Sequence, residues 1–340
     1  MNGAALGVHG VKSFFGGIAF MHKLSGLQLL GLSAIGVVAV SAILRVLISP
    51  AFRQQDNEVV IREPGERLLG RPQPLADEAR KDVDFAFLSQ AAYQRTANSK
   101  IEKTDCYLNP DETLESSGWK RWTDFPDTTV LAKIEKSHLR VEVWENAQRD
   151  EVALAFGGTV FTNKADWRAN LRWFMPTKQD EYTQIVEVLG PSFINEFLER
   201  EARGELRNTT KLFATGHSLG GGLAQEFAYS LPLNPSVPRV TQVYAFDPSP
   251  VTGYFSVDKG TRDINTKTLC IDRIYERGEI LAILRSFTNF ILPPSATNPV
   301  IRQIRYKLFS RAPITGHSIS LLACKLKTAL SSQPTASTTN

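Results

Sequence analysis

The chain has 340 residues, enough for one α/β domain with appendages. Hydrophobic residues make up 42% and charged residues 22%, which is typical of a globular protein and excludes a disordered one. The 39 basic and 35 acidic residues give a net charge of +4, too balanced to indicate a nucleic-acid partner. Three widely spaced cysteines predict neither a metal cluster nor a disulfide framework. We expect Cys106, Cys270 and Cys324 to be buried free thiols, with a single disulfide as the alternative.

The N-terminal region, residues 1–48, contains one long apolar run. No Asp or Glu precedes Asp56, and residues 24–44 are almost wholly apolar and rich in small side chains. Because about 20 helical residues cross a bilayer, we expect a transmembrane helix at about 24–46 and a single-pass membrane location. A secretory signal cleaved after Ala42, which would give a secreted protein, and a buried helix of a soluble protein are the alternatives. Basic residues flank the run almost equally, so its orientation stays open.

The next segment, residues 49–80, carries four prolines among charged residues and is predicted to be a linker or wrapping arm. The main domain is expected at 81–330, where Asp82–Tyr93 suits a short amphipathic helix. Residues 331–340 are polar and rich in Ser and Thr, which predicts a flexible tail.

Strand-like apolar runs alternate with helical segments through the main domain. Residues 182–201 have helical apolar spacing, although Gly190-Pro191 is expected to break or kink that helix. The alternation predicts a mostly parallel sheet with helices on both faces. The expected strands are 139–144, 151–156, 210–215, 239–246 and 268–275.

A second apolar run, residues 280–292, is too short and too polar to span a membrane. With basic residues nearby, the run is predicted to be a solvated basic helix, with contact to an anionic membrane as the alternative. The nearby basic residues are Arg302, Arg305, Lys307 and Arg311.

Residues 216–220 read Gly-His-Ser-Leu-Gly, between an apolar strand and a helical segment. Small residues at Gly216 and Gly220 permit the sharp turn that presents a serine hydroxyl above a sheet. A serine so presented is a candidate nucleophile, and the Leu219 amide at the helix N-terminus is a candidate donor to an oxyanion. The pattern predicts an α/β-hydrolase acting through Ser218.

Residues 215–224 resemble the nucleophile segment of the class 3 lipases. Residues 156–159, Phe-Gly-Gly-Thr, followed by Asp166-Trp167, resemble that family's oxyanion strand, although Gly157 stands where the family commonly has Arg. The resemblance runs from about residue 82 to 327 and implies that Thr159 supplies a second oxyanion amide. A strand ending in two glycines agrees, since it leaves a bare backbone open to close approach.

The general base of this fold lies late in the chain, and His317 is the one histidine that follows Ser218. His217 is expected to point away from the serine hydroxyl. For the acid, the resemblance indicates Glu279 by position, where the family has Asp. Asp247, at the end of the preceding strand, is the alternative, and Asp272 within its strand is expected to be structural.

The apolar side chains after the oxyanion strand suit either a lid that contacts lipid or packing under a loop. Those proposed to contact substrate are Trp167, Trp173 and Phe174, next to Met175. Together these features predict a membrane-associated lipase or phospholipase that needs no cofactor or metal, with lipid and membrane as partners and protein partners unknown. An acyltransferase or thioesterase with the same triad, and a non-catalytic membrane-tethered binding protein, are the alternatives.

Overall fold

The chain divides into two compact units, residues 1–54 and 55–340, and all elements named below belong to the second. The transmembrane helix expected at about 24–46 lies outside the described residues. Among the helices that are described, none has the length and apolar character needed to cross a bilayer. The computed structural model describes residues 54–67, 70–94, 105–134, 137–158, 180–278, 293–309 and 317–331.

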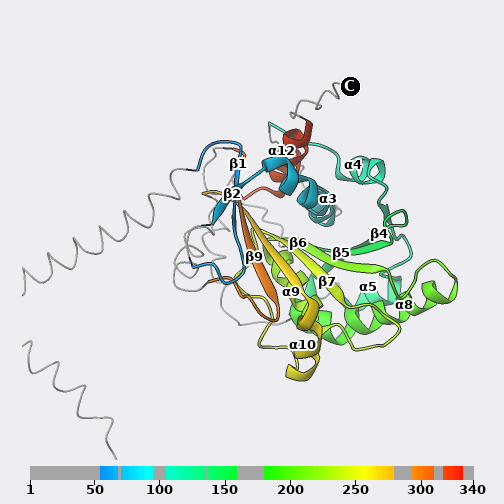
Figure 1. The fold of residues 1–340 in the computed structure, drawn as a ribbon. Helices are drawn as coiled ribbons and strands as arrows, with labels where there is room; N and C mark the ends of the chain where they lie inside the picture. The colour runs from blue at the N-terminus through cyan, green and yellow to red at the C-terminus, as the bar shows by residue number, and fades with distance from the viewer. Residues whose placement is uncertain are drawn as a thin grey trace, which may run out of the picture. The chain divides into compact units, whose positions relative to one another are not determined.

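A single mixed sheet forms the centre of the second unit (Figure 1). Within the described residues it has nine strands in the order β2-β1-β9-β8-β7-β6-β5-β4-β3. Strands β5 to β9 are parallel neighbours, whereas the strands at both edges pair antiparallel. The strands are β1 (Glu58–Arg62), β2 (Arg71–Gln73), β3 (Lys120–Arg121), β4 (Arg140–Asn146), β5 (Glu151–Gly157), β6 (Lys211–His217), β7 (Val240–Phe246), β8 (Cys270–Glu276) and β9 (Val300–Lys307).

Helices cover both faces of this sheet (Figure 1). One face carries α3 (Leu75–Gln94), α4 (Pro110–Ser116) and α12 (Ile319–Ser331). The other carries α5 (Thr128–Ile134), α7 (Asp180–Gln184), α8 (Gly190–Ala202), α9 (Leu219–Ser230) and α10 (Lys259–Asn265). The mostly parallel α/β sheet with helices on both faces, predicted from the sequence, is therefore confirmed.

Side-chain size along β5 determines how closely the two helical layers approach the sheet. Alternate residues of a strand face opposite sides, so Leu154 and Phe156 face α9 while Ala153 and Ala155 face α3. All four are fully buried. The small alanines let α3 pack closely on β5, which brings Tyr93, near the end of α3, beside the carboxyl ends of β5 and β6.

Three elements differ from their predicted form. The segment 49–80 contributes β1 and β2, because Val59 and Ile61 are buried in the core and β1 pairs with β9. The expected short helix is the first part of a longer one, α3. At Gly190-Pro191, where a break or kink was proposed, a π-helical turn, Ile185–Leu189, is followed directly by α8. Pro191 lies in the first turn of α8, where a helix can hold proline without losing a hydrogen bond.

The apolar run at 280–292, where a solvated basic helix was expected, lies outside the described residues, whereas the basic residues 300–307 that follow it are described. They form β9, in which alternate side chains, including Ile304 and Tyr306, pack into the core on the face of the sheet that α3 covers. Arg302 instead forms an ion pair with Asp272 of the neighbouring strand, with Nη2 2.8 Å from Oδ2. Asp272 thus has the structural role expected for it.

The cysteines also differ from expectation, because two of them form a disulfide. Cys106, before α4, is bonded to Cys324 of α12, with Cα atoms 5.8 Å apart, and Cys270 is free. The two cysteines are 218 residues apart in sequence, so their spacing did not predict the bond. They meet because α12 packs beside α3. The disulfide joins the C-terminal helix to the loop that follows α3.

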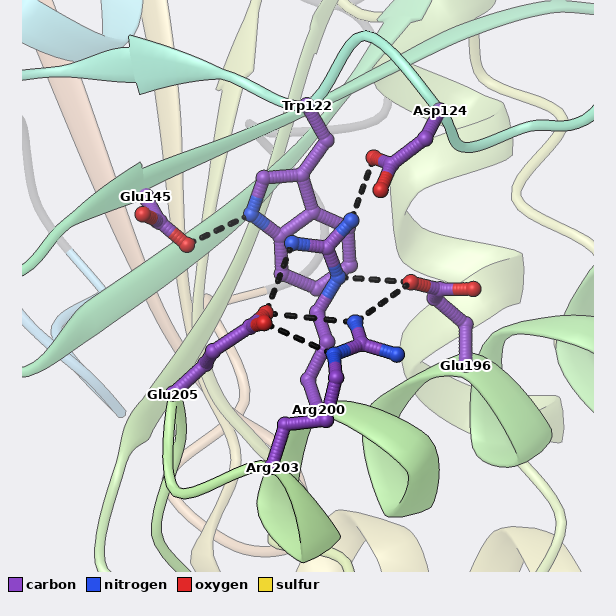
Figure 2. Close-up of polar contacts among 7 residues, drawn as sticks. All are labelled: Trp122, Asp124, Glu145, Glu196, Arg200, Arg203 and Glu205. Carbon is purple, nitrogen blue, oxygen red and sulfur yellow. Dashed lines mark hydrogen bonds and ion pairs between the residues drawn. The ribbon is translucent and has the colours of Figure 1, made fainter.

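A buried arginine ties together three segments on the α8 side (Figure 2). The Arg200 guanidinium lies 3.8 Å from the ring centroid of Trp122 and is only 8% exposed. It bonds to Glu196 at 2.6 Å, to Glu205 at 3.3 Å, and to Asp124. Because carboxylates of α8, of the loop after α8 and of the segment after β3 share one buried cation, the cluster links these three segments.

Candidate active site

The turn between β6 and α9 holds Ser218 in a backbone conformation that L-residues rarely adopt, with φ 58° and ψ −121°. A Cβ on Gly216 would lie 2.3 Å from the Gly220 carbonyl oxygen, and a Cβ on Gly220 would lie 2.2 Å from the Phe156 carbonyl oxygen. Both positions therefore require glycine. The turn is fixed by two backbone hydrogen bonds, from Ser218 N–H to Phe246 O and from Ser249 N–H to Ser218 O, each 2.9 Å.

Tyr93 of α3 reaches this turn from the other side of the sheet. Its hydroxyl donates to the His217 carbonyl oxygen at 3.0 Å and lies 3.2 Å from His217 Nδ1. A Cβ on Gly158 would come within 1.9 Å of the same hydroxyl. Burial raises the pKa of the Tyr93 phenol, and hydrogen bonding to Gly158 and to the Ser218 side chain partly opposes that rise. The bare backbone of Gly158 thus makes room for Tyr93 beside the serine.

His217, Asp247 and His317 converge next to Ser218. The two imidazole rings are 4.5 Å apart at their centroids, and His217 Nε2 lies 3.8 Å from Asp247 Oδ2. One nitrogen or oxygen atom from each of the three residues lies within 4.8 Å of the others. Since β6 ends at His217, the His317 ring and the Asp247 carboxylate lie beside the nucleophile turn.

Asp247 is held firmly at this point. It is fully buried, has φ 41°, and its N–H donates to Ile274 O at 2.7 Å. Its Oδ1 accepts a 3.3 Å hydrogen bond from the N–H of Glu276. A carboxylate fixed by a backbone donor and adjacent to a histidine is suited to orienting an imidazole.

The same three side chains, His217, Asp247 and His317, are residue types that bind transition metals, and their spacing would admit an ion. The backbone hydrogen bond to Asp247 and the adjacent strained serine, however, correspond to the parts of an acyl-transfer site. That arrangement needs a nucleophile, a base and an orienting carboxylate.

Glu276 is a second buried acid, at the end of β8. Burial, together with the nearby Asp247 carboxylate, raises its pKa to about 9, although the hydrogen bond from the Leu308 N–H opposes the rise. Leu308 N–H bonds to both of its carboxyl oxygens, at 3.0 and 3.2 Å. At neutral pH this carboxyl group is mainly protonated, so Asp247 does not face a second full negative charge.

Several residues proposed from the sequence lie outside the described part of the chain, whereas Ser218, His317 and Asp247 are described and lie together. Leu219 is the first residue of α9 and is partly buried against the core. His217, expected to point away from the Ser218 hydroxyl, contacts Tyr93 and the Asp247–His317 group. The residues outside the described ranges are Thr159, Glu279, Trp167, Trp173, Phe174 and Met175.

Sequence reasoning missed Tyr93 and Glu276. Tyr93 lies 124 residues before His217, and its position at the end of an amphipathic helix gives no sign of its contact with the nucleophile turn. Glu276 had a weak signal, because a charged residue that ends a strand of a parallel sheet lies at the edge where ligands bind.

The family model that matches this chain agrees with an ester hydrolase of the lipase or phospholipase type. Residues 84–232 match the family model of a Tle-like phospholipase domain. No curated protein matches the sequence significantly. Among solved structures, lipase II from Rhizopus niveus is similar in fold at 15% identity, covering 72% of this chain and 86% of that one, with a TM-score of 0.40. The Rhizomucor miehei lipase–propeptide complex gives 16% identity, coverage of 66% and 65%, and a TM-score of 0.39.

Proposed function

We propose that the protein hydrolyses a carboxylic ester of a lipid by acyl transfer to Ser218 and then to water. The observation that carries the proposal is the strained Ser218 turn beside His317 and the buried Asp247. The match of residues 84–232 to a phospholipase-like domain supports a lipid ester as the substrate.

In the proposed mechanism, His317 removes the Ser218 proton as Oγ attacks the ester carbonyl carbon, and then gives that proton to the departing alkoxide. Water repeats the sequence on the acyl-enzyme and releases the fatty acid. The Leu219 amide, at the N-terminus of α9, and the Thr159 amide stabilise the oxyanion of each tetrahedral intermediate.

We propose Asp247 as the acid that orients His317. Its burial, its backbone hydrogen bonds and its distance from the histidines support this role. Glu279, the residue favoured from the sequence, is the competing assignment. Asp247→Asn and Glu279→Gln variants distinguish the two assignments. We expect Asp247→Asn to lower kcat by about 10⁴-fold, as loss of a triad acid does, and Glu279→Gln to retain most of the activity. The reverse result would assign the role to Glu279.

The cellular location is also proposed. We propose that the apolar run at 24–46 anchors the protein in a membrane and that the hydrolase domain faces an oxidising compartment. The disulfide between Cys106 and Cys324 supports an oxidising compartment, because disulfides persist where thiols are not kept reduced. Protease protection of sealed vesicles tests the orientation, and a domain protected on the reducing side would contradict it.

The function is tested by incubating the purified full-length protein with diacylglycerol or glycerophospholipid in mixed micelles and measuring released fatty acid. Wild type and a Ser236→Ala control, altered at an exposed turn, should release fatty acid at equal rates. Ser218→Ala should lose at least about 10⁴-fold of that rate. Equal fatty-acid release by the Ser218→Ala variant would refute the proposal.

A further inference from the structure

Arg140 is a partly buried cation on β4, the strand next to the candidate oxyanion strand β5. It lies on β4 directly opposite Gly157 of β5 in the antiparallel register. A Cβ on Gly157 would lie 3.1 Å from the Arg140 Cβ and 3.3 Å from its Nε. The missing side chain of Gly157 therefore leaves space that the Arg140 side chain occupies.

The guanidinium of Arg140 lies one aromatic ring away from the nucleophile. Its Cζ is 5.5 Å from the centroid of the Tyr93 ring, and the hydroxyl at the far end of that ring contacts the nucleophile turn at His217. A group bound to Arg140 would thus be separated from Ser218 by about the length of a tyrosine side chain. That separation suits a substrate whose anionic group is a few bonds from its ester.

The charge of Arg140 is incompletely satisfied by the described residues around it. Its Nη1 is buried and has no hydrogen-bond partner among the described residues. Burial lowers the pKa of the guanidinium, and the charges of Tyr93 and Glu181 only partly offset that effect. Arginine nevertheless remains protonated in proteins, so this site favours an anion with oxygen acceptors.

We propose that Arg140 binds the phosphate of a glycerophospholipid and thereby selects phospholipids over neutral acylglycerols. The proposal rests on the function proposed above. Arginine presents a planar set of donors that fits phosphate oxygens, and the phosphodiester of a glycerophospholipid is joined to the acyl esters through the glycerol. A neutral acylglycerol carries no negatively charged oxygen that could accept these hydrogen bonds.

The test compares three substrates in neutral-detergent micelles: phosphatidylcholine, a diacylglycerol with the same acyl chains, and the soluble ester p-nitrophenyl butyrate. For Arg140→Gln we expect kcat/KM on phosphatidylcholine to fall by about 10- to 100-fold, while the other two substrates change by less than about threefold. Arg140→Lys, which keeps the charge, should recover part of the loss. Arg239→Gln, at an exposed residue just before β7 and far from Ser218, serves as the control.

Binding of the headgroup is measured separately with glycerophosphocholine as an inhibitor of p-nitrophenyl butyrate hydrolysis. Wild type should be inhibited, and the inhibition constant of Arg140→Gln should rise by about tenfold or more. An equal loss on all three substrates, or unchanged inhibition by glycerophosphocholine, would overturn the phosphate assignment and leave Arg140 as a support for Tyr93. Failure of the underlying function is distinct, since wild type would then hydrolyse none of the three esters.

Discussion

Glu226 of α9 gives a stability prediction that follows from its burial. Its side chain is 1% exposed; Oε1 accepts a 3.1 Å hydrogen bond from Ser256, and Oε2 has no hydrogen-bond partner among the described residues. Burial raises the pKa of this carboxyl group from 4.5 to about 7. The folded protein therefore holds this proton more tightly than the unfolded chain does.

The sign and size of the effect follow from those two pKa values. Below pH 4.5 the carboxyl group is protonated in both states and contributes no pH dependence. As the pH rises from 4.5 to 7 the unfolded chain ionises first, so the free energy of unfolding falls. A pKa difference of about 2.5, at about 1.4 kcal/mol per unit, corresponds to a loss of about 3.5 kcal/mol that is complete about one pH unit above 7.

Glu226→Gln removes this ionisation. Relative to wild type, its free energy of unfolding should be about 2.5 kcal/mol larger at pH 8.5 than at pH 5, as measured by urea denaturation at both pH values. The comparison between variants cancels the contribution of Glu276, which is present in both. Glu115→Gln, at an exposed residue of α4, is the control and should show no such difference. A relative stability of Glu226→Gln that is the same at both pH values would refute the reasoning.

Three further predictions concern the fold around the site. Replacing Cys106 and Cys324 by Ser removes a 218-residue covalent loop and should lower the free energy of unfolding by about 5 kcal/mol, as measured by urea denaturation; an unchanged midpoint would contradict this. Gly220→Ala places a Cβ 2.2 Å from Phe156 O, so ester hydrolysis should fall by at least about tenfold and stability by about 1–3 kcal/mol; retained activity would show that the turn tolerates displacement. Arg200→Met leaves its carboxylate partners without a cation and should cost about 3 kcal/mol, which thermal unfolding would reveal as a lower Tm; an unchanged Tm would contradict a stabilising role.

The central strands and the nucleophile turn were predictable because their signals are local. The β5 and β6 runs are apolar and short, and Gly216 and Gly220 are required by contacts within the turn or with the next strand. Local pattern did not predict β9, because basic residues interrupt its apolar positions. There Arg302 meets Asp272 across strands, a pairing that sequence spacing does not reveal.

The candidate site was predictable only in part, for a related reason. Ser218 and His317 follow from motif and chain order, but the choice of acid depends on which carboxylate lies beside the imidazole. Asp247 is brought there by the end of β7 and by a left-handed backbone conformation that no sequence pattern indicated. Tyr93 and Arg140 likewise reach the site through the packing of α3 and through strand register.

The central claim is that Ser218 is a nucleophile activated by His317. The most direct measurement is covalent labelling of the folded full-length protein by a fluorophosphonate, with the modified peptide identified by mass spectrometry. We predict a single adduct on Ser218 that is absent in Ser218→Ala and forms at least about 10²-fold more slowly in His317→Gln, because the base no longer accepts the serine proton. No adduct at Ser218 in wild type, or an equal labelling rate in His317→Gln, would contradict the account.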